Sequence, residues 1–377
     1  MRCLLLFGTR PEAIKLAPLL LALRACSDVT PIAVCTGQHR DMVAPVLDFF
    51  GIRPDRTLQL MQTEQSLTAL TRRLLDTIPE IIEEEQPHLV LVHGDTTTAM
   101  VGALCAHLAG IPVAHIEAGL RTGDLRAPFP EEFNRRAIDA ASDWLFAPTA
   151  AAAATLAREG HPPHRIFTVG NTATDALRLC LAAPPVKELI PIAAAGKRLL
   201  VLTAHRRELR AQDMTALLRA IREEIEGRED VFLLFPVHPA PAVRRAARSA
   251  FAHCANAALT DPLPLPAMQQ LLARATLLLT DSGGLQEEAT YLGLPTLVLR
   301  DVTERPEGVA AGVLSLAGSR PSQVRSALAA LLDNAARIAA MAHKSDVYGD
   351  GYVSKRITEL LRRQIFPALI EREAKRK

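Results

Sequence analysis

Two acidic residues of this 377-residue chain stand where a carboxylate can move protons. Asp95 and Glu117 each come directly after a short apolar run that is typical of a buried strand. A carboxylate in such a place is costly to bury without a partner, and burial raises a carboxyl pKa toward the range useful for general acid or base catalysis. Both residues also have a structural explanation, because Asp95 can cap the next helix and Glu117 can pair with Arg121 or Arg126.

A second pattern is typical of phosphate binding. In GTRPEAIK, a glycine follows an apolar run, a proline suits the first turn of a helix, and Arg10 and Lys15 add positive charge. In TDSGGLQEE, small residues let backbone N–H groups approach a diphosphate, and Glu288 one turn later can accept ribose hydroxyls. The small residues are Ser282, Gly283 and Gly284. The competing explanations are a capped helix with solvated charges and an ordinary turn.

Other polar residues give weaker signals. His205 and His238 each stand at the end of a predicted strand, which suggests contact with a ligand, although either one alone is as well explained as a core residue. Glu131 and Arg135 share one face of a predicted helix, where a routine ion pair is the simplest explanation.

Short apolar runs alternate with helical patterns, which predicts α/β domains built on mostly parallel sheets. Strands at Cys3–Phe7 and Leu89–His93 and a helix at Glu12–Arg24 are examples. The pattern restarts at Leu199–Thr203, so we expect two doubly wound, Rossmann-like domains that bind a ligand in the cleft between them. The predicted limits are 1–172 for the first domain, 173–355 for the second and 356–377 for a C-terminal helix, which packs back on the first domain or ends the second.

The composition excludes several classes of protein. With 49% hydrophobic residues and a net charge of +2, the chain is neither disordered nor broadly basic as nucleic-acid binders are. The six cysteines form no C-x-x-C pair, which argues against disulfides or zinc and fits the cytoplasm. No segment is predicted to span a membrane. Neither dinucleotide nor P-loop glycine motifs occur in the sequence, which argues against a dinucleotide dehydrogenase and a P-loop phosphotransferase.

An ordered set of segments resembles the non-hydrolysing UDP-N-acetylglucosamine 2-epimerase family. The segments are GTRPEAIKLAP, TGQHRDM, HGDTTTA, HIEAGLRTGD, FPEEFNRR, AHRRE, PVHP, DSGGLQEEA and TERPEGV, running from Gly8 to about Gly312. The resemblance implies a GT-B-like fold, with two Rossmann-like domains facing across a cleft, and a homodimer. It also implies reversible conversion of UDP-GlcNAc into UDP-ManNAc without a cofactor, neither a metal nor a nicotinamide. In such enzymes UDP is eliminated to give 2-acetamidoglucal and then added back, and the product supplies ManNAc units for surface polysaccharide.

The same resemblance implies roles for individual residues. The carboxylates of Asp95, Glu117 and Glu131 would handle the proton at C2, and His205 would assist the departure and return of UDP. Substrate contacts would fall on Arg10, Lys15 and Arg135 in the first domain and on Ser282, Gly283, Gly284, Glu288 and Arg305 in the second. In bacterial members a second UDP-GlcNAc can bind as an activator, and the residues in motifs linked to that site are Gln38, His39, Arg206 and His238.

Three alternatives stay open. A hydrolysing epimerase would share the architecture but release free ManNAc and UDP. A GT-B glycosyltransferase would need an acceptor site and would leave the acidic trio without a purpose. A non-catalytic nucleotide-sugar sensor would be expected to lose acid–base residues before its fold, yet all are present. The sequence departs from the family pattern at Leu209 and Ala240, where asparagine is usual, and at Val302, where threonine is common.

Overall fold

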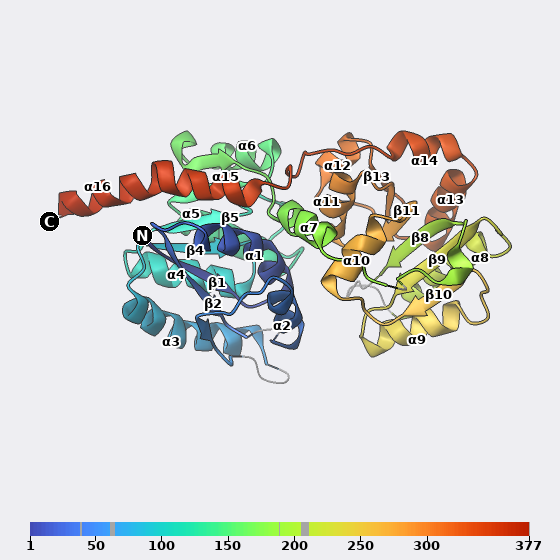
Figure 1. Ribbon diagram of the computed structural model, residues 1–377, viewed down its shortest axis with the longest axis horizontal. Helices are drawn as coiled ribbons and strands as arrows, with labels where there is room; N and C mark the ends of the chain where they lie inside the picture. Colours follow the sequence, from blue (N-terminus) through green and yellow to red (C-terminus); the bar gives the residue numbers. More distant parts are fainter. Residues whose placement is uncertain (38–39, 61–64, 188, 205–210, 377) are drawn as a thin grey trace. The chain divides into compact units, whose positions relative to one another are not determined.

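The computed structural model describes residues 1–37, 40–60, 65–187, 189–204 and 211–376. The chain forms two compact units (Figure 1). Unit 1 comprises Met1–Ala176 and Gly349–Lys377, and unit 2 comprises Leu177–Tyr348. The chain therefore passes between the units twice. The predicted domain limits at residues 172 and 355, and the cleft between the domains, stay predictions.

Unit 1 contains, among its described residues, a parallel sheet of seven strands in the order β3-β2-β1-β4-β5-β6-β7. The strands are β1 Arg2–Phe7, β2 Thr30–Cys35, β3 Arg56–Thr57, β4 Leu89–His93, β5 Val113–Ile116, β6 Trp144–Ala147 and β7 Ile166–Thr168. The inner strands are built mostly of Val, Leu and Ile side chains that are buried, as expected where helices cover both faces of a sheet. The strand order reverses between β1 and β4, and ligands of this fold bind beyond the carboxyl ends of the strands at such a point.

Helices connect the strands of unit 1 and lie on both faces of its sheet (Figure 1). They are α1 Arg10–Arg24, α2 Arg40–Phe49, α3 Leu67–Glu85, α4 Thr97–Leu108, α5 Glu131–Ala141, α6 Ala150–Arg158, α7 Ala173–Ala182, α15 Val353–Leu360 and α16 Phe366–Arg376, and α7 continues into unit 2. The C-terminal segment packs back on unit 1, where α15 contacts α1 and Arg362 Nε lies 2.9 Å from Asp28 Oδ2.

Unit 2 repeats the plan with, in its described part, a parallel sheet of six strands in the order β10-β9-β8-β11-β12-β13. The strands are β8 Arg198–Thr203, β9 Val231–Pro236, β10 Ala257–Thr260, β11 Leu277–Thr280, β12 Thr296–Val298 and β13 Leu314–Leu316. The helices are α8 Ala211–Ile225, α9 Pro241–Ala250, α10 Leu265–Leu272, α11 Gly283–Leu292, α12 Pro306–Ala310, α13 Pro321–Leu332 and α14 Ala335–Met341. The strand order reverses between β8 and β11, where the Thr203 and Thr280 hydroxyls lie 2.7 Å apart.

The predicted fold class is confirmed, because both sheets are parallel and doubly wound. Predicted element ends differ by a few residues. Helix α1 begins at Arg10 and not at the predicted Glu12, because Thr9 is its N-cap and Glu12 completes a capping box with it.

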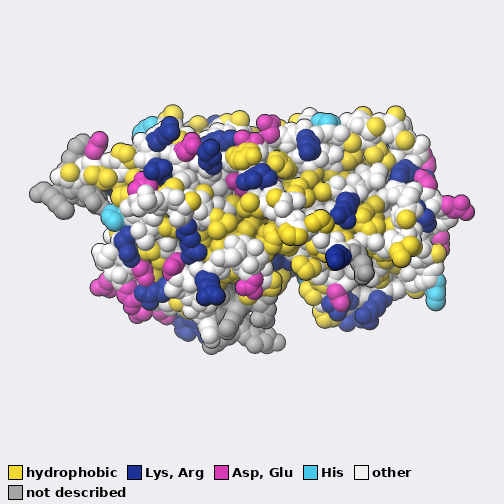
Figure 2. Space-filling view, viewed as in Figure 1, with side chains coloured by type: hydrophobic (Ala, Val, Ile, Leu, Met, Phe, Trp, Pro, Cys, Tyr) yellow, Lys and Arg dark blue, Asp and Glu magenta, His cyan; other side chains and the backbone are white. Residues whose placement is uncertain are grey.

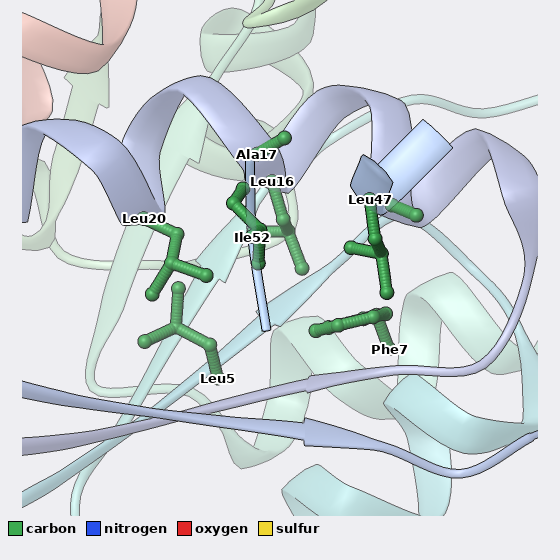
Figure 3. Close-up of a pocket in the computed structure, with 8 residues that line it drawn as sticks. Leu5, Phe7, Leu16, Ala17, Leu20, Leu47 and Ile52 are labelled. Carbon is green, nitrogen blue, oxygen red and sulfur yellow. The ribbon is translucent and has the colours of Figure 1, made fainter. Parts of the chain in front are cut away.

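A small gap beneath α1 is lined only by apolar side chains, among them Leu5, Leu16 and Leu20 (Figure 3), so a polar ligand or water finds no partner there. Lys and Arg side chains are interspersed with Asp and Glu on the visible face (Figure 2). Across the described residues, every helix is too short or too polar to cross a membrane.

Candidate active site

The candidate site of unit 1 lies where the strand order reverses, and Glu12 joins the two loops that flank this point. Its Oε2 accepts hydrogen bonds from the N–H groups of Gly8 (3.0 Å) and Thr9 (2.8 Å) after β1. Its Oε1 accepts one from the Thr96 hydroxyl after β4, over 2.6 Å. Burial raises the pKa of Glu12, although these hydrogen bonds oppose the rise. Arg10 begins α1 beside this junction, with an exposed side chain.

Glu117 follows β5 in a left-handed backbone conformation, with φ of +72°. Such a conformation is strained for a residue with a side chain and is common at functional sites. The carboxylate is buried, and its Oε2 contacts Lys15 Nζ and accepts a hydrogen bond from Asn171 Nδ2 over 2.5 Å. The predicted alternative partner, Arg121, is wrong, because Arg121 pairs with the carboxylates of Asp139 and Glu159 instead.

His93, the last residue of β4, lies beside the Glu117 carboxylate. Its Nε2 is 3.9 Å from Glu117 Oε2 and, within the described part of the chain, has no hydrogen-bond partner. The ring is almost fully buried, and this burial lowers the pKa of His93 to about 3. We conclude that His93 is neutral at physiological pH and does not compete with Lys15 as the cation that pairs with Glu117.

Asp95 occupies the loop after β4, and its carboxylate is reachable from solvent with 26% of the side chain exposed. Its Oδ2 accepts a hydrogen bond from Arg135 Nη2 over 2.6 Å. Burial raises the pKa of Asp95 and the nearby Glu117 adds to the rise, while Arg135 opposes it. The alternative that Asp95 caps α4 is wrong, because the Thr96 hydroxyl accepts the capping hydrogen bond from the N–H of Ala99.

Helix α5 supplies Arg135 and begins at Glu131. The Arg135 side chain is buried, and its Nη1 lies 3.5 Å from Glu132 Oε2. Arg135 therefore joins the Asp95 loop to α5, in place of the simple helical pair with Glu131 that the spacing suggests. Its Nε has no hydrogen-bond partner among the residues that the structure describes. Glu131 is half-buried, one turn before Arg135 on the same helix.

The candidate site of unit 2 is the N-terminus of α11. The half-buried residues there are Ser282, Gly283 and Gly284. Arg305 Nη2 lies 3.7 Å from the position that a Cβ would take at Gly283, and Arg305 Nε pairs with the buried carboxylate of Glu287. A guanidinium beside the N-terminus of a helix forms a site for an anion such as a diphosphate. Glu288 is buried, and its Oε2 accepts a hydrogen bond from Gln269 Nε2 over 2.9 Å.

Several predicted residues lie outside the described part of the chain. They are Gln38, His39, His205 and Arg206. Of the predicted activator residues, the structure describes His238, which is exposed after β9 and accepts a hydrogen bond at Nδ1 from the N–H of Ala240 over 3.2 Å. The described residues contain no group of three or more His, Cys, Asp and Glu side chains arranged to hold a metal ion.

The chain is similar to known proteins along nearly its whole length. A family model described as UDP-N-acetylglucosamine 2-epimerase matches residues 21–362. The UDP-N-acetylglucosamine 2-epimerase of Bacillus subtilis (strain 168) is 42% identical over 364 residues, which cover 96% of this chain and 95% of that protein. The chain belongs to the UDP-N-acetylglucosamine 2-epimerase family. The Escherichia coli (strain K12) member is 41% identical, with 96% of this chain and 98% of that protein covered.

Solved structures of the epimerase family agree with this fold. The Neisseria meningitidis UDP-GlcNAc 2-epimerase, solved bound to UDP-GlcNAc, is 37% identical and superposes with a TM-score of 0.90 over 97% of this chain and all of that one. The S. aureus MnaA structure with UDP is 38% identical, with a TM-score of 0.91 over 98% of this chain and 97% of that one. The family and fold predicted from the sequence motifs are confirmed, and the chain is an enzyme of this family.

Sequence reasoning missed three residues of this epimerase that the structure brings to the edge of the sheet. They are Glu12, His93 and Asn171. Glu12 had a signal, because Thr9 and Glu12 have the spacing of a capping box. Asn171 had one too, since it follows a predicted strand just as Asp95 and Glu117 do.

Proposed function

We propose that this epimerase interconverts UDP-GlcNAc and UDP-ManNAc at C2 without net hydrolysis. Its family membership makes it an epimerase. The substrate is inferred from the name of the B. subtilis relative and from the Neisseria structure, which was solved with UDP-GlcNAc bound. The structure with UDP supports the same nucleotide.

One observation in unit 1 carries the proposal. Asp95 and Glu117 follow adjacent strands, β4 and β5, and each carboxylate is paired with its own cation, Arg135 and Lys15. Removal of the proton at C2 and its return on the other face require two acid–base groups, and two carboxyl groups with different surroundings suit such a division. We assign this role to Asp95 and Glu117, with Glu131 at the start of α5 as the third carboxylate.

The reaction that we propose has two steps, an elimination of UDP and its re-addition with the C2 proton delivered to the other face of the sugar. A carboxylate takes the C2 proton while the C1–O bond to the diphosphate breaks, which gives 2-acetamidoglucal and UDP. UDP then adds back to C1 while a carboxylic acid delivers a proton to C2. Delivery of this proton to the face of C2 opposite the one that lost it gives UDP-ManNAc.

Unit 2 is proposed to bind the UDP moiety. The positive end of α11 and the Arg305 guanidinium would stabilise the negative charge that develops on the leaving diphosphate. Gly283 and Gly284 leave room for close approach of the phosphates, and Glu288 is assigned to the ribose. In unit 1 we assign Arg10, Lys15 and Arg135 to the substrate. His205 is proposed to assist the departure and return of UDP.

We propose that the enzyme is a cytoplasmic homodimer that supplies ManNAc units for surface polysaccharide. A second UDP-GlcNAc is proposed to act as an activator, through residues of the motifs that hold Gln38, His39, Arg206 and His238.

The test is to incubate the purified protein with UDP-GlcNAc and to separate the products by ion-exchange chromatography. We expect UDP-ManNAc to form until it reaches equilibrium with UDP-GlcNAc, with little free sugar. Release of ManNAc and UDP would mean a hydrolysing enzyme. No conversion at any concentration of UDP-GlcNAc, including concentrations high enough to fill an activator site, would contradict the proposed function and favour a transferase or a sensor.

A further inference from the structure

Asn171 holds the Glu117 carboxylate from the segment that follows β7. Its Nδ2 donates a hydrogen bond to Glu117 Oε2 over 2.5 Å, and the two residues are only 2% and 9% exposed. The same carboxylate oxygen contacts Lys15 Nζ. Two donors from different elements, α1 and the segment after β7, therefore fix the orientation of one carboxylate.

Asn171 is itself held by the start of α7. Its Oδ1 accepts a hydrogen bond from the N–H of Ala173 over 3.0 Å, and its backbone oxygen accepts one from the Thr174 hydroxyl over 2.9 Å. The Thr174 hydroxyl oxygen in turn accepts a hydrogen bond from the N–H of Gly351 over 3.3 Å. The segment after β7 is thus joined to a segment almost two hundred residues later in the chain.

Asp175 makes a second connection between the same two segments. Its carboxylate accepts hydrogen bonds from the N–H groups of Val353 (3.0 Å) and Ser354 (2.8 Å) at the start of α15. The chain leaves unit 1 after Ala176 and returns to it at Gly349. Both passages between the units therefore border the segments, residues 171–175 and 349–354, that hold Asn171.

We propose that Asn171 is a positioning residue for Glu117, and that the joined segments 171–175 and 349–354 keep it in place. The inference rests on the proposed function, in which Glu117 must be aimed at the C2 proton. Small errors in the placement of a reacting group cost much of the rate, whereas substrate binding depends on many other contacts. The two ends of the Asn171 side chain have separable roles, since Oδ1 caps α7 and Nδ2 orients Glu117.

Two substitutions separate these roles. Asn171→Ser keeps an oxygen near the α7 cap but leaves nothing that reaches Glu117. Asn171→Asp keeps the size and the capping oxygen and replaces the donor by a carboxylate that repels Glu117. In both variants we expect kcat for epimerisation to fall by about 10²-fold while KM for UDP-GlcNAc stays within about threefold. If Asn171 is only a helix cap, kcat in both variants will stay within about twofold of wild type, which would overturn the inference.

A matched control is Asn334→Ser. Asn334 is the N-cap of α14, and its side chain accepts a hydrogen bond from the N–H of Arg337, much as Asn171 accepts one from the N–H of Ala173 at the start of α7. Its substitution is expected to leave kcat unchanged. Thr174→Val tests the joined segments, because valine has the same shape but lacks the hydroxyl that links Asn171 to Gly351. We expect a smaller loss of kcat, about tenfold, and an unchanged kcat would refute the part assigned to the joined segments.

A crystal structure of the Asn171→Ser variant decides the inference without any assay. We expect the Glu117 carboxylate to move by about 1 Å or more from its contact with Lys15. An unmoved carboxylate would overturn the inference even if the enzyme is an active epimerase. Conversely, a wild-type protein that does not epimerise UDP-GlcNAc would refute the proposed function, while this structure would still test the positioning of Glu117. If Asn171→Ser does not fold, Asn171→Asp serves in the same experiment.

Discussion

Asp95 and Glu117 differ in the surroundings that set their protonation. Asp95 reaches solvent with 26% of its side chain, and its pKa is raised by burial and by the nearby Glu117. Glu117 is buried against Lys15, a cation that favours a charged carboxylate, and beside the neutral His93. Different surroundings for two nearby carboxyl groups are the usual way in which an enzyme divides acid and base roles.

Removing either carboxylate should therefore stop the chemistry and spare nucleotide binding. We expect Asp95→Asn and Glu117→Gln each to lower kcat by about 10²-fold to 10⁴-fold, with the Kd for UDP within about threefold of wild type. Initial rates and calorimetric titration with UDP measure the two quantities. Glu80→Gln, at an exposed position on α3, is the control and should behave as wild type. Near-normal turnover in both active-site variants would remove these residues from proton transfer.

The phosphate assignment at the start of α1 has its own test. Arg10 is exposed at the N-terminus of this helix and is assigned to the substrate. Arg10→Ala should weaken UDP binding by about tenfold, because a charge-assisted contact is worth about 1.5–3 kcal/mol. Arg72→Ala, which removes an exposed arginine on α3, is the matched control. An unchanged Kd for UDP in Arg10→Ala would count against the assignment.

The location of a site residue was predictable from the sequence where that residue directly follows a strand. Asp95 and Glu117 follow apolar strands, and the carboxyl ends of parallel strands meet at one edge of a sheet. Their partners were not predictable, because Lys15 is 102 residues from Glu117 and Arg135 is 40 residues from Asp95. Local spacing offered Arg121 or Arg126 as a partner for Glu117, but in the folded structure Arg121 pairs with Asp139.

Among the elements of unit 1, β5 and α5 are joined by a buried contact between His115 and Asp139 behind the site. His115 Nε2 lies 2.7 Å from the carbonyl oxygen of Gly94, and its Nδ1 lies 2.6 Å from Asp139 Oδ1. The Asp139 carboxylate and the Gly94 carbonyl thus hold the His115 ring at both of its nitrogens. The pair thereby fixes the backbone that leads from β4 into Asp95.

Breaking this pair should destabilise unit 1. Asp139→Asn leaves the buried Arg121 guanidinium without this carboxylate and weakens the contact with His115, at an expected cost of about 3–5 kcal/mol in the free energy of unfolding. Burial raises the pKa of Asp139, but His115 and Arg121 hold it below its ordinary value of 3.8. Its contribution is therefore complete above that ordinary value and is lost as the pH falls through the lower pKa of the folded state.

Urea denaturation at neutral and acidic pH measures both effects. The stability difference between wild type and Asp139→Asn should be large at neutral pH and should shrink in acid, below about pH 4. Asp76→Asn, at an exposed position on α3, is the control. A difference that does not change with pH would mean that the carboxylate charge is not what Asp139 contributes.

Helices and strands were easier to predict from the sequence when they were long and had a regular apolar pattern. The central strands and α4 follow from apolar runs and from the threonines before the helix. The edge strands β3 and β13 have two and three residues, too few for any periodicity, and only pairing with a neighbouring strand defines them. The first residue of α1 depends on its N-cap, Thr9, which binary patterning does not specify.

In the whole molecule, we assign the nucleotide to unit 2 and the acid–base groups to unit 1. The restart of the βα pattern near residue 199 predicted two sheets, and both are present in the described residues. No sequence pattern marks the return of the C-terminal segment to unit 1, because that return depends on contacts such as those of Asp175 with Val353 and Ser354.

Hydrogen–deuterium exchange with and without UDP tests this division. We expect UDP to protect amides at the N-terminus of α11 and in the segment before α12, which carries Arg305, more than it protects the core of unit 1. At a UDP concentration of about 100 times Kd, bound nucleotide stabilises the folded state by about 2.7 kcal/mol. This stabilisation is enough to slow the exchange of those amide hydrogens that exchange only when the site opens. Protection confined to unit 1 would contradict the assignment of UDP to unit 2.

The most direct test of the account is proton NMR of the wild-type enzyme with UDP-GlcNAc in deuterated water. Loss of the C2 proton to a carboxylate that exchanges with solvent predicts UDP-ManNAc that carries deuterium at C2, with deuterium also entering the recovered UDP-GlcNAc over time. Both signals should be almost absent with Glu117→Gln. Formation of UDP-ManNAc that keeps its original proton at C2 would contradict the central claim, because the epimerisation would then not pass through removal of that proton to a solvent-exchanging group.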